Sequence, residues 1–271
     1  TTEIYTLSLH DALPICIMLK QDDKIPFTSH LEELRRRLII CFIAIGIGFA
    51  AAYGFKERLF DILTAPLVQV MDAGDKIIFT GLPEAFFTYL KVSFLVGILL
   101  ASPVITYQFW LFVAPGLYDK EKRYLFPIVL LSFLFFAGGA LFGYFIVFPL
   151  GFKFFLGFAT DVIRPLPSMK EYLGFAAKML LAFGLAFELP LVIVFLSKLG
   201  LVSVTFLKRN RKYAILLFFV FAAILTPPDV VSQIMMAVPL MILYELSILG
   251  ARVFGKKITE ESPTEASTDE K

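Results

Sequence analysis

The sequence predicts an all-α polytopic membrane protein, a concave bundle of six transmembrane helices. Hydrophobic residues make up 58% of the 271 residues, and 31 Phe are among them, which exceeds what soluble globular chains carry. Apolar stretches long enough to cross a bilayer recur along the chain, and basic residues gather between alternate stretches. The formal net charge of +2 is too small to suggest a nucleic-acid partner.

The first 17 residues are expected to carry no function. They contain no methionine and resemble a translated sequencing adapter fused to the reading frame. We therefore interpret residues 1–17 as a non-native leader and Met18 as the native start. A genuine flexible leader is the alternative.

Residues 18–37 are predicted to form a cytoplasmic amphipathic helix that lies at the membrane surface and leads into the first span. Leucines recur on one face at helical spacing, and Glu33 precedes Arg37 by four residues, the order that favours an ion pair. The alternative is that the arginines at 35 to 37 only set the topology. A cleavable signal peptide has a similar pattern, but five further spans are inconsistent with a simple secreted precursor.

Six apolar segments are predicted to build a membrane domain over residues 38–250. A hydrocarbon core of about 30 Å needs about 20 helical residues, and the fifth segment supplies only about 14, or about 21 Å. The sixth contains Gln, Pro and Glu, so we expect the fifth and sixth helices to be short and to thin the bilayer locally. The segments run from Leu38 to Phe55, from about Ala85 to Leu111, from Tyr124 to Phe148, from Leu173 to Leu196, from Tyr213 to Thr226 and from Val230 to Gly250.

The distribution of basic residues predicts that both termini are cytoplasmic. Lys and Arg cluster before the first segment, between the second and third, between the fourth and fifth, and after the sixth. The opposite side carries fewer, spread over longer loops, so the positive-inside rule fixes the orientation. Residues 251–271 then form a cytoplasmic disordered tail.

The loop between the second and third segments has the composition of a peptide-binding face. The stretch FWLFVAPGLYDKEKRYLFP, residues 109–127, places aromatic Phe112 and Tyr118 beside the carboxylates of Asp119 and Glu121. Carboxylates and aromatic rings together suit a basic, partly apolar peptide. An ordinary charged loop is the alternative.

One ionisable residue lies deep in the fourth segment. In GLAFELPLVIVFL, Glu188 stands at mid-membrane depth, where a charge costs about 3 kcal/mol or more. Pro190 follows and frees a backbone carbonyl, so this site is expected to face protein or water. Asp229 and Gln233 add polar groups at the start of the sixth segment. Purely structural hydrogen bonds between helices are the alternative.

The sequence contains no recognisable catalytic motif and no recognisable cofactor-binding motif. Both histidines lie outside the spans, and neither a metal-ligand cluster nor a glycine-rich phosphate loop occurs. We predict that the protein is not an enzyme and uses no cofactor. A proton-coupled secondary transporter with an intramembrane glutamate is the alternative function, although we find no clear internal repeat of the kind that such transporters carry.

Four motifs in order, HLEELRRRL, FVAPGLYDKE, FELP and TPPDVVSQ, resemble the TatC family over roughly residues 25–255. TatC is the polytopic core of the twin-arginine protein translocase. The resemblance implies a receptor for twin-arginine signal peptides on folded cargo, driven by the proton-motive force. It also implies TatA- and TatB-type single-span partners, a multi-copy complex, and a place in the cytoplasmic (inner) membrane of a prokaryote.

The resemblance also implies roles for individual residues. The family's signal-peptide-binding positions fall on one group of six residues, and its intramembrane polar or partner-contact positions fall on another group of three. The proline of the first outer loop falls on Pro66. The first group is Glu33, Arg35, Arg37, Phe112, Pro115 and Glu121, and the second is Glu188, Asp229 and Gln233.

Overall fold

The computed structural model describes residues 27–71, 77–79, 81–113, 125–158, 166–226 and 229–255. Within these residues the regular structure is helical, apart from one isolated bridge between Ile78 and Ser168. The all-α prediction is therefore confirmed for this part of the chain. The predicted leader and Met18 lie outside the described residues. The predicted disordered tail, residues 251–271, is wrong at its start, because the last helix continues to Phe254, and residues 256–271 lie outside the described residues.

The helices follow one another in the order that the apolar segments predict, with short helices between some of them. They are α1 (Phe27–Tyr53), α2 (Lys56–Val68), α3 (Glu84–Val113), α4 (Leu125–Phe142), the π-helix η4 (Gly143–Val147), α5 (Phe148–Leu156), α6 (Met169–Phe187), α7 (Leu189–Lys198), α8 (Val204–Arg209), α9 (Arg211–Leu225) and α10 (Val230–Phe254).

Five stretches of the described residues are long and apolar enough to cross a membrane. The remaining predicted span corresponds to α9, which has 15 residues, or about 22 Å of helix, and is as short as the sequence predicts. Six spans, the concave shape of the bundle and the orientation of the termini stay predictions. The five stretches are Leu31–Tyr53, Glu84–Val113, Phe126–Leu156, Met169–Lys198 and Val230–Phe254.

The prediction that the sixth helix is short is wrong. Helix α10 has 25 residues and continues past Gly250, and its polar residues do not interrupt it. The amide Nε2 of Gln233 donates a hydrogen bond to the carbonyl oxygen of Phe219 at 3.0 Å. Arg211 donates to the carboxylate of Glu245 at 2.8 Å. Because both partners belong to α9, these polar groups join two neighbouring helices.

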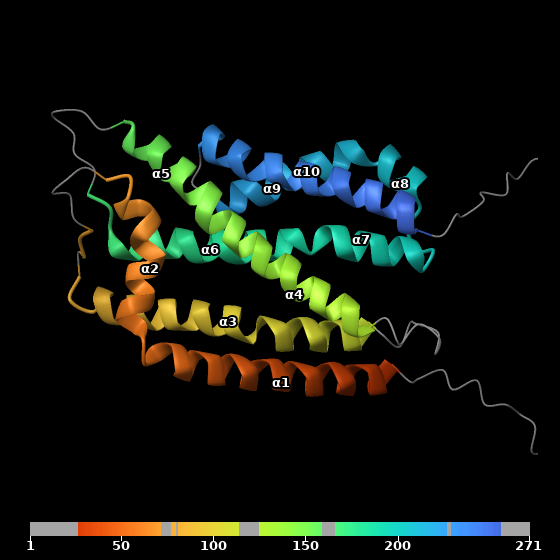
Figure 1. Ribbon diagram of the computed structural model, residues 1–271, viewed down its shortest axis with the longest axis horizontal. Coiled ribbons are helices and arrows are strands. Elements are labelled where there is room, and N and C mark those ends of the chain that lie inside the picture. The colour runs from red at the N-terminus through yellow and green to blue at the C-terminus, as the bar shows by residue number, and fades with distance from the viewer. Residues whose placement is uncertain are drawn as a thin grey trace, which may run out of the picture.

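Figure 1 shows α1, α3 and the consecutive helices α6 and α7 lying side by side, with α4 running obliquely from the end of α3 across α6. Helices α9 and α10 lie together on the side of α6 and α7 that is away from α3, and the short α2 lies across one end of the bundle. The core is centred on α6, where Ala176 and Phe183 are fully buried.

Helix α1 is continuous from Phe27, so no break separates the described part of the predicted amphipathic helix from the first predicted span at residue 38, and residues 18–26 of that prediction lie outside the described residues. It touches α3 backbone to backbone at two glycines. A Cβ atom built on Gly48 would lie 2.6 Å from the carbonyl oxygen of Gly97, which no side chain can accept. This close approach holds α1 alongside α3, so the first turns of α1 face the last turns of α3.

Candidate functional site

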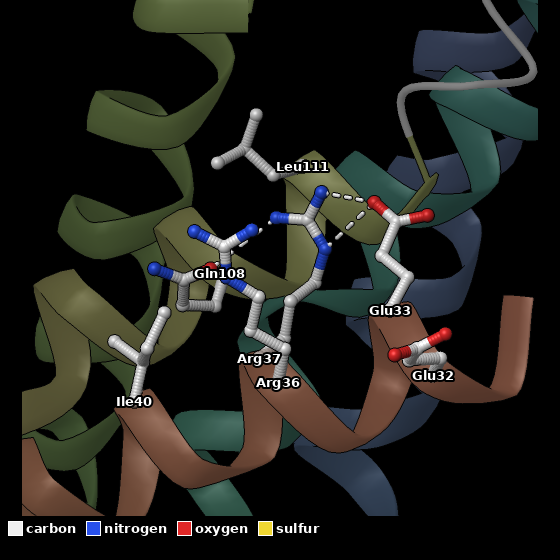
Figure 2. A pocket seen from close by; sticks show the side chains of 7 residues that line it. All are labelled: Glu32, Glu33, Arg36, Arg37, Ile40, Gln108 and Leu111. Carbon is white, nitrogen blue, oxygen red and sulfur yellow. Dashed lines mark hydrogen bonds and ion pairs between the residues drawn. The ribbon is translucent and has the colours of Figure 1, made fainter. Parts of the chain in front are cut away.

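The facing ends of α1 and α3 enclose a hollow of about 660 Å³, which we call the α1–α3 hollow. It combines charged groups with apolar walls, as Figure 2 shows. Two carboxylates and two guanidinium groups come from α1, and an amide and a leucine come from α3. Its lining residues are Glu32, Glu33, Arg36, Arg37, Ile40, Gln108 and Leu111.

Arg37 is held between the two helices (Figure 2). Its Nε atom donates a hydrogen bond to Oε1 of Glu33 at 3.0 Å, and Nη2 donates to the same oxygen. Its Nη1 atom donates to the side-chain oxygen of Gln108 at 3.2 Å. The ion pair predicted from the spacing of Glu33 and Arg37 is therefore confirmed. Gln108 was not predicted, although it is a polar residue in the apolar last turns of α3.

Only one of the two carboxylate oxygens of Glu33 accepts hydrogen bonds in this network. Both bonds from Arg37 end on Oε1, and no other described residue donates to Oε2. The side chain of Glu33 is 34% exposed, whereas that of Arg37 is 18% exposed. The hollow therefore offers one open carboxylate oxygen beside the apolar Ile40 and Leu111.

The structure brings together only part of the predicted signal-binding set. Arg35 is exposed and is not part of the lining of the α1–α3 hollow. Phe112 is half-buried in the last turn of α3, one residue beyond Leu111. Pro115 and Glu121 lie outside the described residues, so their place beside Glu33 stays a prediction.

Glu188 forms a second polar site at the junction of α6 and α7. The helix stops at Phe187 and restarts at Leu189, because Pro190 has no N–H to donate to the carbonyl oxygen of Ala186. The hydroxyl of Ser132, a buried residue of α4, lies 2.7 Å from each oxygen of the Glu188 carboxylate. The carboxylate is thus tied to a neighbouring helix, and its role in transport stays a prediction.

Asp229 and Gln233 lie at the start of α10. The Asp229 side chain caps the helix, since Oδ1 accepts a hydrogen bond from the backbone N–H of Ser232 at 2.7 Å. The Gln233 amide is used in the bond to α9 described above. Gln233 is thus bonded between helices and Asp229 within its own helix, and a role of either residue in partner contact stays a prediction.

Pro66 lies inside α2 and frees a backbone carbonyl there. Because proline has no N–H, the carbonyl oxygen of Ile62 loses its helical donor. The hydroxyl of Tyr144, in η4, donates to this oxygen at 2.5 Å, and the hydroxyl of Tyr172, in α6, donates to the carbonyl oxygen of Leu63 at 2.6 Å. Pro66 thus sits where two tyrosines fasten α2 to the bundle, and sequence reasoning missed both tyrosines.

Metal chemistry has no support in the described part of the chain. No group of three or more His, Cys, Asp or Glu residues there is arranged to hold a metal ion.

Comparison with known proteins gives a consistent result. A family model described as Sec-independent protein translocase protein (TatC) matches residues 29–239. The TatC protein of Desulforapulum autotrophicum is 69% identical over 240 residues, which cover 89% of each chain. The TatC protein of Escherichia coli K12 is 37% identical over 233 residues, covering 86% of this chain and 90% of its own.

Solved structures agree with the sequence matches. Two crystal structures of the twin-arginine translocase receptor TatC, one of them in DDM, superimpose with TM-scores of 0.76 and 0.75. They are 45% and 44% identical to this chain, cover 83% and 81% of it, and are themselves covered to 98%. The family consists of protein translocase components and not of enzymes. The chain therefore belongs to the TatC family of Sec-independent protein translocase proteins.

Proposed function

We propose that the α1–α3 hollow, with the loop that follows α3, is the receptor face for twin-arginine signal peptides. The solved relatives are described as twin-arginine translocase receptors. The observation that carries the proposal is the Glu33 carboxylate, which is partly exposed, has one open oxygen and lies beside apolar side chains.

The chemistry of this face suits an arginine pair followed by an apolar segment. A guanidinium group offers parallel N–H donors that fit the two oxygens of a carboxylate, and such charge-assisted pairs are stronger than neutral hydrogen bonds. Ile40 and Leu111 provide apolar surface next to Glu33. We propose Glu121 as the second carboxylate, which would give each arginine of the cargo its own partner.

The setting of this face follows from the charges. Basic residues on α8 and at the start of α9 support a cytoplasmic position for the α1–α3 hollow and for both termini, by the positive-inside rule. In this arrangement α9 is a sixth, short span. The protein would reside in the cytoplasmic (inner) membrane, in a multi-copy complex with TatA- and TatB-type single-span proteins, and use the proton-motive force.

The alternative function, a proton-coupled secondary transporter, has no support. It rested on an isolated intramembrane glutamate, and Glu188 is hydrogen-bonded to Ser132 of a neighbouring helix. The family match and the solved relatives all belong to a protein translocase.

An export assay in a bacterial strain that lacks its own TatC tests the function directly. The wild-type chain should restore export of a folded reporter that carries a twin-arginine signal, and Glu33→Gln should not. Arg209→Gln, a change of one charge on the exposed surface of α8, serves as the matched control and should export normally. Absence of export with well-inserted wild-type protein would count against the proposal, as would normal export by Glu33→Gln.

A second experiment tests the proposed short span. Replacing residues 213–226 with 22 leucines would lengthen this helix by about 12 Å and relieve any local thinning of the bilayer. We expect the protein to keep its topology and lose export. Normal export would show that the length of α9 does not matter.

A further inference from the structure

We propose that Arg37 is an internal competitor of the signal peptide that favours arginine over lysine, and that Gln108 holds Arg37 when it leaves Glu33. The inference rests on the proposed function, since it assigns a role to two residues of the same hollow. It starts from the fact that the carboxylate proposed to read the cargo is already paired within the chain.

The first step concerns the two oxygens of Glu33. Arg37 occupies Oε1 through two nitrogen atoms, while Oε2 receives no hydrogen bond from the described residues. An incoming cation can therefore make a first contact with Oε2 while Arg37 stays in place. A second contact, to Oε1, requires Arg37 to leave.

The second step explains why Arg37 can leave. Removing a partly buried guanidinium from its carboxylate is costly when it is left without a partner. Arg37, however, also donates to Gln108 at 3.2 Å, from a nitrogen that Glu33 does not use. The Gln108 side chain can therefore keep a hydrogen bond to Arg37 after Arg37 leaves Glu33. This bond lowers the free-energy cost of replacing Arg37 by an arginine of the cargo.

The third step yields the selectivity. An arginine of the cargo presents a planar fork that can take both oxygens of Glu33 and replace the two bonds that Arg37 gives up. A lysine presents a compact ammonium group, which can occupy Oε2 but is a poor bidentate replacement at Oε1. Because Arg37 competes for this carboxylate, it lowers the affinity for a lysine peptide more than the affinity for an arginine peptide. It therefore serves as a repulsive element that increases specificity.

Arg37 and Glu33 are hydrogen-bonded to each other, but their removal should change the affinity for the signal peptide in opposite directions. Removing Glu33 should weaken binding of the arginine peptide by about tenfold or more. Removing Arg37 should strengthen binding and weaken discrimination. If Arg37 instead contacted the signal peptide favourably, its removal would weaken binding. The two cases differ in sign, so they can be separated by measurement.

The experiment is a photo-cross-linking titration of full-length protein in native membranes. Two synthetic signal peptides are compared, one with its arginine pair and one with both arginines replaced by lysine. Arg37→Gln should bind the arginine peptide about two- to fivefold more tightly, the range expected for loss of a partly exposed ion pair, and should bind the lysine peptide with a larger gain. Gln108→Leu, which removes the residue that retains Arg37, should weaken binding of the arginine peptide and leave the Glu33–Arg37 pair intact.

The controls separate this inference from the proposed function. Arg209→Gln removes the same charge far from the hollow and should bind both peptides like wild type. If Glu33→Gln weakens binding while Arg37→Gln also weakens it or leaves it unchanged, the internal-competitor role is overturned and the receptor face stands. If neither Glu33→Gln nor Arg37→Gln alters binding, both the receptor face and the competitor role are wrong.

Discussion

Glu33 and Glu188 are two carboxylates in one helical bundle, and their surroundings differ in a way that separates two uses of the same side chain. Glu33 is partly exposed, shares one oxygen with a charged neighbour on its own helix and leaves the other open. Glu188 sits at a break between α6 and α7, with both oxygens 2.7 Å from the hydroxyl of buried Ser132. We propose that the first carboxylate exchanges its partner, whereas the second is hydrogen-bonded to a neighbouring helix.

The largest effect is expected at the exchangeable carboxylate. Glu33→Gln or the loss of Glu121 should weaken binding of a twin-arginine peptide by about tenfold or more, because each charge-assisted contact contributes about 1.5 to 3 kcal/mol. Glu121→Lys should be worse, since it adds repulsion to the lost contact. Peptide cross-linking measures the loss. Protein abundance in the membrane should stay unchanged, and a drop in abundance equal to the drop in binding would contradict this account.

A different outcome is expected at the fixed carboxylate. Glu188→Ala should leave the protein inserted and its affinity for the signal peptide within about twofold, yet weaken export, because the polar contact between α4 and the α6–α7 junction is lost. Glu188→Gln should be milder, since its amide can still pair with the Ser132 hydroxyl. Export and peptide binding are measured on the same membranes. If Glu188→Ala lost binding as fully as Glu33→Gln does, the contrast between the two sites would fail.

The smallest effect is expected at the hydrogen bond between Tyr144 and the carbonyl oxygen of Ile62, which has a structural role only. Tyr144→Phe removes the hydroxyl that satisfies the Ile62 carbonyl freed by Pro66, and should lower the stability of the purified protein by about 0.5 to 1.5 kcal/mol. Tyr213→Phe, on an exposed ring of α9 for which no hydrogen bond is described, is the matched control. Thermal unfolding in detergent compares them, and equal midpoints for the two variants would show that the freed carbonyl needs no partner.

Local patterns in the sequence predicted much of this structure. The apolar segments located the long helices, and Pro190 indicated a freed backbone carbonyl beside Glu188, although the break between α6 and α7 was not predicted. The four-residue spacing of Glu33 and Arg37 predicted their pair, because residues four apart face each other on a helix.

Contacts between distant parts of the chain could not be predicted in this way. Gln108 meets Arg37 across 71 residues of sequence, and no local pattern joins them. The full length of α10 was missed because Gln233 and Glu245 find their partners on α9. Helix α2 was also missed, since it has 13 residues of mixed polarity and is held by tyrosines from η4 and α6.

The central claim is that the α1–α3 hollow reads the arginine pair, and one measurement tests it most directly. A photo-reactive residue placed at Leu111, in the wall of the hollow, reports whether a signal peptide enters. The same residue at Leu249, on an exposed face of α10, is the control position. The account predicts that the twin-arginine peptide cross-links at position 111 and not at 249, and that its twin-lysine counterpart cross-links at neither. Equal cross-linking of the two peptides at position 111 would contradict it.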